Sequence, residues 1–483
     1  MNYIMAVDAG STHIKAAIFD QEGKVTAWSQ RKAEVYFPKA GFVEQDPDQI
    51  YRAVIEAIQD TMAKAGIASN QVTALGITNQ RINVIMWDAR TGRLICNAMS
   101  WQDQRGPDMM PGFMAKQTVE YTIASLFAGK ILWLYKEIPD LRSRMEAGEV
   151  VFGGVDTWLL WKLTGGQVHA TDVSNASTTI LYDLSRSGWN TEILAEANIP
   201  VSIFPKVMDS SHIFGYVSTP DLDLSCPIAS VAADQHASLF GHRCFCPGQA
   251  KATFGTGSFV LANMGSSANP PPPGIVKHAA WSLHGQTTFA LEGSILDSGS
   301  ALEWLMDGMG LVGSLDDLDT LAASVDSSAG VCFVPALSGL GSPSWDTRAR
   351  GLLIGLTRAT RKGHIARAAL NALAFQVREI TDLMGFAFSG AQSLHIDGRP
   401  AMNACLVQTL ADTCQVTVAR AVNYNATLTG AAYLAGLSAG VWPSLEAIEN
   451  LDAHYDMFSP QRDMEKEYGK WLEAVRRSRS WLD

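Results

Sequence analysis

Apolar and polar positions alternate at the start of the chain in a pattern typical of a β-hairpin. Residues 3–7 and 16–19 form two apolar runs, and Gly10, Ser11 and Thr12 lie between them. The pattern predicts two strands joined by a tight turn. No helical pattern follows the turn, which excludes a Walker phosphate loop, because that loop leads from a strand into a helix.

The same design recurs past the midpoint of the chain, where residues 254–259 read Phe-Gly-Thr-Gly-Ser-Phe between two apolar runs. Backbone N–H groups and Ser or Thr hydroxyls in such turns can surround phosphate oxygens, because small side chains let the main chain come close. Either turn alone is typical of an ordinary hairpin. Two of them, with Asp8 at the end of the first strand, favour two related halves that grip one polyphosphate.

Between and after the hairpins, the pattern alternates between strand and helix, which indicates an α/β protein. The strands that we expect are residues 72–77, 84–87, 228–232, 331–334 and 394–396. We expect helices over residues 120–137, 362–384 and 429–436. Two further helices are expected to begin near residue 47 and at residue 156, with Asp156 as the N-cap of the second. Four consecutive prolines, residues 270–273, predict a surface excursion. The two lobes are expected to divide as residues 1–242 and 243–483.

Composition narrows the class of protein. The chain has 483 residues, of which 47% are hydrophobic and 18% charged, so it is long enough for two well-packed lobes. A net charge of −11 argues against a nucleic-acid partner or an anionic membrane surface. Seven scattered cysteines fit a reducing cytoplasm rather than a disulfide framework. We expect neither a secretion signal nor a membrane span.

One carboxylate stands out as a candidate catalytic group. Asp234 follows an apolar strand and precedes a helix of small residues, so it can point into a cleft, accept a hydroxyl proton and bind Mg²⁺ through water. An ordinary helix N-cap is the alternative and has about even weight. The polar clusters at residues 79–81 and 101–103 suit the hydroxyls of a sugar or polyol, although loop capping accounts for them equally well.

Several segments resemble the FGGY family of carbohydrate kinases, and most closely its glycerol kinase branch. The resemblance runs from about Tyr3 to about Trp442. Taken together its motifs are highly specific, and they include GFVEQDP at residues 41–47, GITNQR at 76–81, WQD at 101–103, VDTWL at 155–159, FGTG at 254–257, FVPA at 333–336, WD at 345–346 and the segment 349–370.

The resemblance implies two actin-like ATPase domains of the ribonuclease-H-like type, with an interdomain cleft that binds ATP. It assigns Asp234 as the catalytic base, and Asp8 and Asp234 as the Mg²⁺ ligands. The implied polyol or sugar pocket consists of Arg81, Ile82, Trp101, Ser125, Asp234, Gln235 and Phe259. The implied ATP contacts are Ser11, Thr12, Lys15, Gly255, Thr256, Gly299, Glu303, Arg399 and Asn403. A homodimer is left open.

Three positions depart from the glycerol kinase pattern. Ile82 replaces a glutamate, Ser125 stands where tyrosine is usual, and Arg399 replaces a glycine near the expected adenine pocket. Loss of a hydrogen-bonding group from a site built for hydroxyls costs discrimination of the order of 10⁴-fold. A polyol or ketose of four or five carbons is therefore as plausible an acceptor as glycerol. A non-catalytic ATP-binding sensor is the alternative from another class.

Overall fold

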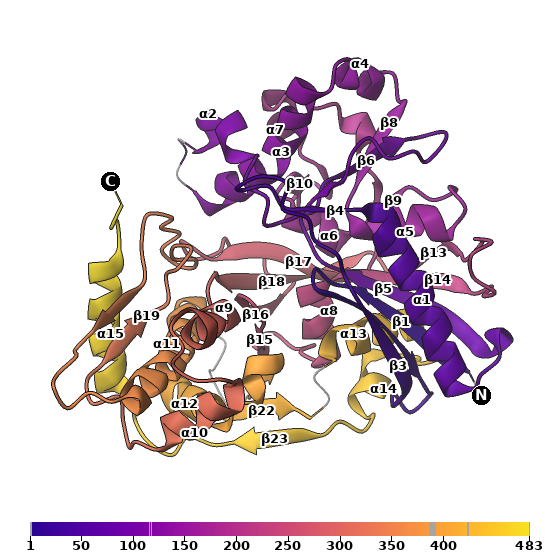
Figure 1. Cartoon of the computed structure of the whole chain (residues 1–483). Helices are drawn as coiled ribbons and strands as arrows, with labels where there is room; N and C mark the ends of the chain where they lie inside the picture. Colours follow the sequence, from indigo (N-terminus) through magenta and orange to yellow (C-terminus); the bar gives the residue numbers. More distant parts are fainter. Residues whose placement is uncertain (1, 115, 117, 386–392, 423–424, 483) are drawn as a thin grey trace. The chain divides into compact units, whose positions relative to one another are not determined.

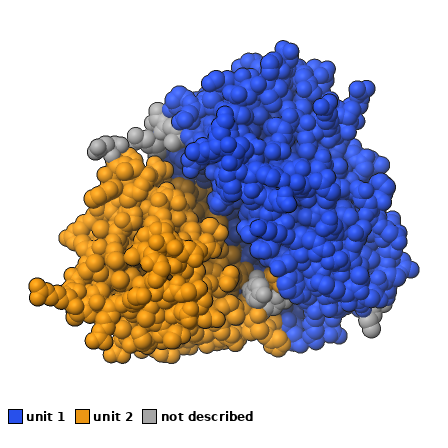
Figure 2. All heavy atoms as spheres, viewed as in Figure 1, with its two compact units in different colours: residues 1–243, 278–289, 426–452 blue, residues 244–277, 290–425, 453–483 orange. Residues whose placement is uncertain are grey.

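The computed structural model describes residues 2–114, 116, 118–385, 393–422 and 425–482. Two compact units make up the chain, and Figure 2 distinguishes them by colour. Unit 1 consists of residues 1–243, 278–289 and 426–452, and unit 2 of residues 244–277, 290–425 and 453–483. Each unit is therefore assembled from three separate stretches of chain.

Unit 1 is built on a six-stranded sheet with the order β13-β14-β5-β1-β2-β3 (Figure 1). Its strands are β1 (Tyr3–Ala9), β2 (His13–Phe19), β3 (Val25–Lys32), β5 (Val72–Asn79), β13 (Ser211–Tyr216) and β14 (Pro227–Ala233). The first three strands pair antiparallel, whereas β5 pairs parallel with both β1 and β14. The hairpin predicted at the N-terminus is confirmed, with both strands slightly longer than the apolar runs.

Two helices show how the sequence shapes the layers beside this sheet. Helix α1 (Pro47–Ala65) begins where Asp46 accepts a hydrogen bond from the Asp48 N–H, and it ends at Gly66, whose φ of 64° suits glycine. Helix α13 (Ala426–Ser438) packs on β1, β5 and β14 and on helix α8 (Asp234–Gly241). A methyl group on Gly430 would collide with the Ala237 carbonyl. The small residues of α13 therefore serve close helix packing.

The remaining part of unit 1 contains further helices and short strands. They are β4 (Glu44–Gln45), β6 (Ile85–Asp88), β7 (Ala98–Met99), α2 (Pro111–Met114), α3 (Val119–Glu137), α4 (Leu141–Glu146), β8 (Val150–Gly153), α5 (Val155–Leu163), β9 (Ala170–Asp172), α6 (Val173–Thr178), β10 (Tyr182–Asp183), β11 (Gly188–Trp189), α7 (Thr191–Glu196), β12 (Lys206–Met208) and α14 (Leu445–Glu449). The predicted Asp156 N-cap is wrong. Gly154 is the cap, and the buried Asp156 side chain accepts hydrogen bonds from Thr157 and Thr171 instead.

Most of unit 2 surrounds a seven-stranded sheet with the order β17-β18-β16-β15-β21-β22-β23, in which most of β17 and the start of β18 belong to the stretch 278–289 of unit 1. Its strands are β15 (Ala250–Phe254), β16 (Ser258–Gly265), β17 (Val276–Leu283), β18 (Gln286–Ile295), β21 (Leu394–Asp397), β22 (Val418–Ala421) and β23 (Tyr455–Phe458). The other elements are α9 (Gly299–Glu303), α10 (Leu315–Ala323), β19 (Cys332–Val334), β20 (Leu352–Ile354), α11 (Lys362–Met384), α12 (Ala404–Cys414) and α15 (Glu465–Ser478). The second predicted hairpin is thus β15 and β16, and the four prolines lie in a loop, as expected.

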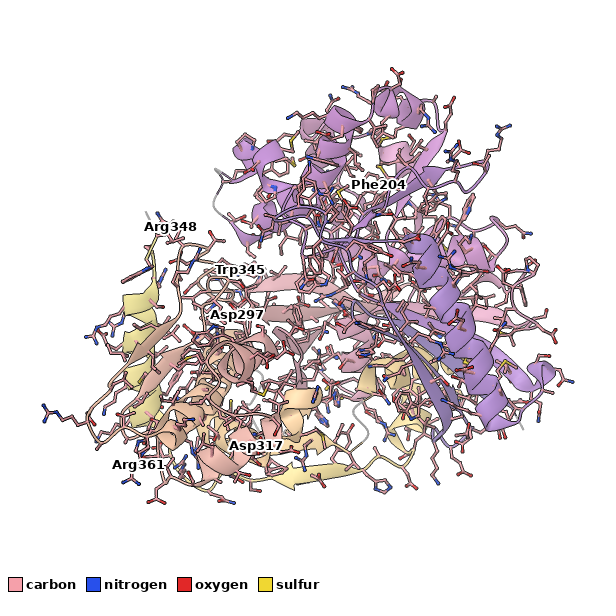
Figure 3. All side chains as sticks on the ribbon, in the orientation of Figure 1. Phe204, Asp297, Asp317, Trp345, Arg348 and Arg361 are labelled. Atoms are coloured by element: carbon pink, nitrogen blue, oxygen red, sulfur yellow. The ribbon has the colours of Figure 1, made fainter. Side chains whose placement is uncertain are left out.

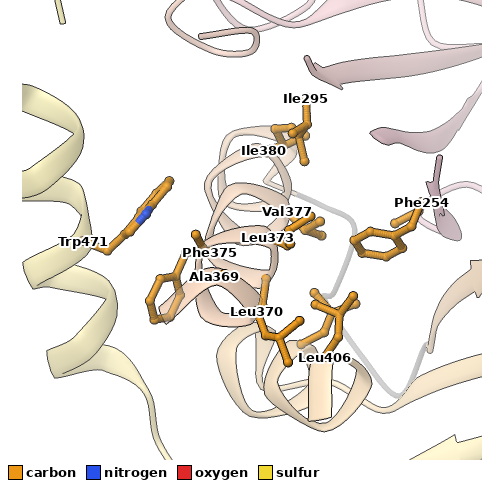
Figure 4. Packing of buried hydrophobic residues seen from close by; sticks show 14 of the residues in the cluster. Phe254, Ile295, Ala369, Leu370, Leu373, Phe375, Val377, Ile380, Leu406 and Trp471 are labelled. Carbon is orange, nitrogen blue, oxygen red and sulfur yellow. The ribbon is translucent and has the colours of Figure 1, made fainter. Parts of the chain in front are cut away.

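Helix α11 is the centre of the unit 2 core, and its bounds match the predicted helix. Leu373 and Val377 face Phe254 of β15, whereas Phe375 faces Trp471 of α15 (Figure 4). One face of this long helix thus packs on the sheet and the opposite face packs on the C-terminal helix. Burial of each apolar side chain of this size contributes about 1.5–3 kcal/mol to the free energy of folding. No helix among the described residues combines the length and apolar character needed to cross a membrane.

Candidate active site

The carboxyl ends of three parallel strands bring the candidate residues of unit 1 to one edge of its sheet. Ala9 of β1 lies opposite Asn79 of β5, and Asn79 lies opposite Ala233 of β14. Asp8, Arg81 and Asp234, which lie within two residues of these aligned positions, are therefore neighbours at this edge. In open α/β sheets this is the edge where ligands bind.

Asp8 is a buried carboxylate beside an incompletely buried cation. Its side chain lies 3.9 Å from the Lys15 ammonium group, its cross-strand partner in the β1–β2 hairpin. Burial raises the pKa of Asp8 to about 6; Lys15 opposes this rise and the charge of Asp234 adds to it. Asp234 therefore lies close enough to Asp8 for the charges of the two carboxylates to interact.

The turn between β1 and β2 is held by backbone contacts. The Thr12 carbonyl accepts a hydrogen bond from the Ala33 N–H at 2.9 Å, and the Ser11 carbonyl accepts one from the Gln45 amide at 3.3 Å. At Gly10, an added methyl group would lie 2.8 Å from the His13 carbonyl, closer than real contacts allow. The turn is therefore compact, and the Thr12 side chain remains exposed.

Asp234 is the first residue of α8 and is paired with Arg81. The Arg81 Nε lies 3.2 Å from Asp234 Oδ1, and the Asp234 side chain is 27% exposed compared with 7% for Arg81. The Gln235 N–H donates to the same carboxylate oxygen at 2.7 Å. Ala233 occupies the N-cap position, so Asp234 does not act as an ordinary cap. The carboxylate is held in place yet remains accessible to a substrate.

Ile82, next to Arg81, has a backbone conformation that β-branched residues avoid. Its φ is 59°, and a left-handed conformation costs an L-residue about 1–2 kcal/mol. Ile82 lines a small cavity of about 20 Å³ with Gln80, Asn83 and Asp156, and Gln80 Oε1 and Asn83 Oδ1 have no hydrogen-bond partner among the described residues. A cavity of this volume holds about one water molecule. Strain at such a position is typical of a functional site.

Trp101 lies beside a buried network of charges. The Lys130 ammonium group, fully buried on α3, donates to the Ser100 carbonyl at 2.6 Å, and burial lowers the pKa of Lys130 to about 7. Asp103 accepts three hydrogen bonds from the Arg105 side chain, at 2.6 to 3.0 Å, and Glu44 lies 2.9 Å from the same guanidinium group. The Arg105 guanidinium group is thus already paired with carboxylates of the protein. The network fixes the loop that carries the half-buried Trp101.

Ser125 is fully buried on α3, and its hydroxyl donates to the Thr122 carbonyl at 2.7 Å. The backbone here is crowded, since a methyl group on Gly106 would lie 2.7 Å from the Ser125 carbonyl. The backbone of α3 therefore lies directly against the Gly106 segment. A direct contact between Ser125 and an acceptor therefore remains a prediction.

Unit 2 carries the other candidate residues, beginning with the β15–β16 turn. The Gly255 carbonyl accepts from the Gly299 N–H at 2.9 Å, and the Thr256 carbonyl accepts from the Ser300 N–H at 3.0 Å. Gly255 and Thr256 are exposed at the turn, and Phe259 follows half-buried on β16. The first turn of α9 thus holds this hairpin by its backbone. The neighbouring Asp297, labelled in Figure 3, accepts a hydrogen bond from the Ser338 N–H at 2.6 Å.

The remaining nucleotide candidates follow β21 or stand at the end of α9. Asn403 caps α12 by accepting from the Leu406 N–H at 2.8 Å, and its amide nitrogen has no partner among the described residues. Arg399 follows Gly398 and is exposed, as is Glu303 at the end of α9. Unit 2 therefore offers backbone groups, one unpaired amide and exposed polar side chains at these positions.

The chain matches both domain models of the FGGY family of carbohydrate kinases, the N-terminal domain over residues 3–241 and the C-terminal domain over residues 250–439. It belongs to this family. The protein is accordingly a carbohydrate kinase, and the two-domain actin-like α/β fold expected from the sequence is confirmed.

Relatives of known identity agree with this assignment. The chain is 40% identical to glycerol kinase 2 of Thermotoga maritima, with all of this chain and 99% of that protein aligned. It is also 40% identical to the glycerol kinase of Caldanaerobacter subterraneus, at the same coverage. The crystal structure of Plasmodium falciparum glycerol kinase with ADP superimposes with a TM-score of 0.90 at 30% identity, covering 99% of this chain and 98% of that one.

Sequence reasoning missed the burial of three charged side chains near the site, one of which, Asp156, it took for a helix cap. Lys130, Asp156 and Asp172 are all less than 2% exposed. Burial raises the pKa of Asp156 to about 7 and also raises that of Asp172. Each of the three lies in an amphipathic or apolar segment where a lone charge is normally on the surface. The one sequence feature that could have indicated their burial is the charged residue itself among uncharged neighbours.

Proposed function

We propose that this kinase transfers the γ-phosphoryl group of ATP to a hydroxyl of a short polyol of the glycerol class. The observation that carries the proposal is the alignment of Ala9, Asn79 and Ala233, because it brings Asp8, Arg81 and Asp234 to one sheet edge. Identity of 40% to glycerol kinases over the whole chain supports the acceptor class.

In this proposal Asp234 is the catalytic base. Its carboxylate accepts the proton of the attacking hydroxyl while Arg81, 3.2 Å away, and the Gln235 N–H hold it in place. The acceptor pocket consists of Arg81, Ile82, Trp101, Ser125, Gln235 and Phe259. Since phosphoryl transfer depends mainly on positioning and charge neutralisation, this rigid setting supplies much of what the reaction requires.

The two hairpins are proposed to bind ATP, with residues 1–242 as the acceptor lobe and 243–483 as the nucleotide lobe. Ser11, Thr12 and Lys15 act from the first hairpin and Gly255 and Thr256 from the second. Gly299, Glu303, Arg399 and Asn403 complete the proposed nucleotide contacts. Neutral backbone groups in such turns suit phosphate oxygens.

Asp8 and Asp234 suit Mg²⁺. Asp8 is buried with the Lys15 ammonium group 3.9 Å away, and the charge of Asp234, which is paired with Arg81, raises the pKa of Asp8, so two carboxylates lie close enough to act on one cation. Mg²⁺ prefers carboxylate oxygens and keeps several waters. When bound, it would neutralise part of the polyphosphate charge. We place the reaction in the cytoplasm, where the seven free thiols stay reduced.

Ile82 supports a second candidate acceptor, a polyol or ketose of four or five carbons. An isoleucine beside the catalytic pair offers no hydrogen bond to a hydroxyl, and it borders a cavity of about 20 Å³ with two unpaired amide oxygens. A longer acceptor can satisfy such oxygens with an additional hydroxyl, whereas glycerol has none to spare.

An acceptor screen tests both candidates. Coupled ADP release is measured with purified protein, ATP and Mg²⁺ against glycerol and a series of C4 to C6 polyols and ketoses. Glycerol with the highest kcat/KM supports the first candidate, and a C4 or C5 compound the second. Turnover with none of them above background ATP hydrolysis would refute the proposed acceptor class.

A further inference from the structure

A cavity of about 150 Å³ lies in unit 2, apart from every residue proposed for catalysis. Three elements form it: α11, α15 and the loop that leads into β19. The floor is apolar where Ala368, Phe375 and Trp471 line it. The Trp471 indole is fixed there, because its N–H donates to the Phe333 carbonyl at 2.9 Å.

The rim of the cavity is basic. Lys466 and Lys470 both line it and are four residues apart on α15, so they project from the same face of the helix. Neither lysine has an ion pair within the described chain. Cys332 also lines the cavity. Burial raises the pKa of its thiol, and the positive charge of Lys470 partly offsets this rise. One carboxylate, Glu467, lies between the two cations.

A buried amide adds a polar group to this cavity. Asn371 lines it from α11 and is 4% exposed, and its Oδ1 has no hydrogen-bond partner in the part of the chain that the structure describes. An unpaired buried polar group costs about 1–3 kcal/mol, so its presence calls for a partner. A ligand hydroxyl can supply both a donor and an acceptor to such an amide.

We propose that this cavity binds a small phosphomonoester that carries hydroxyl groups. Two unpaired ammonium groups one helical turn apart suit a phosphate dianion, because lysine binds phosphate as a point charge. Asn371 and Glu467 suit the hydroxyls of the carbon body, which rests on Phe375 and Trp471. Product-like polyol phosphates belong to this chemical class, and the site lies outside the proposed catalytic machinery.

Alkylation of Cys332 reports on occupancy of this cavity, independent of turnover. The full-length protein is treated with iodoacetamide, and the rate at Cys332 is measured by peptide mass spectrometry, with the exposed Cys246 as internal reference. Glycerol 3-phosphate should slow Cys332 alkylation about fivefold or more, whereas glycerol should have no effect. The variant Lys466→Gln/Lys470→Gln should lose this protection and keep its kcat with ATP and the acceptor.

Two further measurements separate the parts of the proposal. Asn371→Leu removes an unpaired polar group at similar volume, so the variant should fold, bind glycerol 3-phosphate about tenfold more weakly and bind inorganic phosphate unchanged. Equal protection by inorganic phosphate and glycerol 3-phosphate would overturn recognition of hydroxyls. Absence of protection, or protection that persists in the double lysine variant, would overturn the site.

Discussion

The hairpin of β1 and β2 and the hairpin of β15 and β16 carry different chemistry at matching positions. Two residues before its turn glycine, the first hairpin has Asp8, opposite Lys15, whereas the second has Thr253, opposite Phe259. On β21, which pairs with β15 outside the hairpin, Asp397 lies opposite Thr253. The first turn thus carries an ion pair, and the second offers backbone groups and a hydroxyl.

The turns also differ in what supports them. Gln45 and Ala33 hold the first turn through its carbonyls, whereas the second is joined to the start of α9 through Gly299 and Ser300. Position 299 needs a glycine, because any side chain there would collide with the Gly255 carbonyl. We infer that unit 1 supplies the charges of the reaction and unit 2 supplies shape. Changes of charge in unit 1 should therefore affect chemistry, and changes of shape in unit 2 should affect nucleotide affinity.

The largest effect is expected for Asp234→Asn. Loss of the proposed base should lower kcat about 10²- to 10⁴-fold, because general base catalysis contributes in this range. ATP affinity, measured by calorimetry, should change less than about threefold, which corresponds to well under 1 kcal/mol. The control is Asp223→Asn, which makes the same change at an exposed position and should leave kcat unaltered. Unchanged turnover in Asp234→Asn would mean that another group takes the proton.

The second effect, in Asp8→Asn, depends on pH. Burial raises the folded-state pKa of Asp8 from 3.8 to about 6. Below pH 4 the carboxyl group is neutral in both states and its burial costs no free energy of folding. As the pH rises through 6 the buried group must ionise, and the free energy of unfolding falls. Asp8→Asn should therefore be more stable than the parent by about 3 kcal/mol at pH 8, at about 1.4 kcal/mol per pKa unit, and equally stable at pH 4.

Urea unfolding at pH 8, 6 and 4 without nucleotide measures this difference. In the second hairpin Thr256→Ala changes no charge, so its effect on the free energy of unfolding should be the same at all three pH values. A pH-independent difference for Asp8→Asn would show that its carboxylate is not the group that burial penalises.

The third prediction concerns the shape of the second hairpin. A methyl group at position 299 would lie 2.5 Å from the Gly255 carbonyl, so Gly299→Ala must displace the turn. The KM for ATP should rise about 10- to 100-fold, equivalent to about 1.4–3 kcal/mol of lost binding, while the KM for the acceptor changes little. Gly469→Ala on α15, with no atom within 4 Å of the new methyl group, is the matched control. A larger effect on acceptor than on ATP would contradict the division of roles.

Local patterns were enough to predict much of this fold. Both hairpins and the helix at 362–384 follow directly from periodicity and turn residues, because each of these elements is decided by its own neighbours along the chain. The return of α13 to the sheet of unit 1 was not predicted. Its small residues indicated close packing, but the partner is decided by contacts such as that of Gly430 with the Ala237 backbone, which lie far apart in the sequence.

The candidate site shows the same limit. Asp234 was identifiable because a lone carboxylate follows a buried strand, yet its pairing with Arg81 depends on the register of β5 and β14. Asp156 was misread as a cap, because the sequence cannot show that Gly154 takes that place and that Thr171 meets the carboxylate. Burial of Lys130 likewise arises from tertiary packing that opposes the usual preference of lysine for the surface.

The smallest effect expected is at Ile82, where the resemblance to glycerol kinases leads us to expect a glutamate. Glutamate at this position would add an acceptor of hydroxyl hydrogen bonds beside Arg81 and would remove a β-branched residue from a φ of 59°. Ile82→Glu should raise kcat/KM for glycerol about tenfold relative to a C5 polyol. Ile82→Leu relieves the β-branching without adding a polar group, so it should increase stability by up to about 1 kcal/mol and leave this ratio unchanged. If the leucine variant shifts the ratio as far as the glutamate variant, backbone strain rather than hydrogen bonding decides the acceptor.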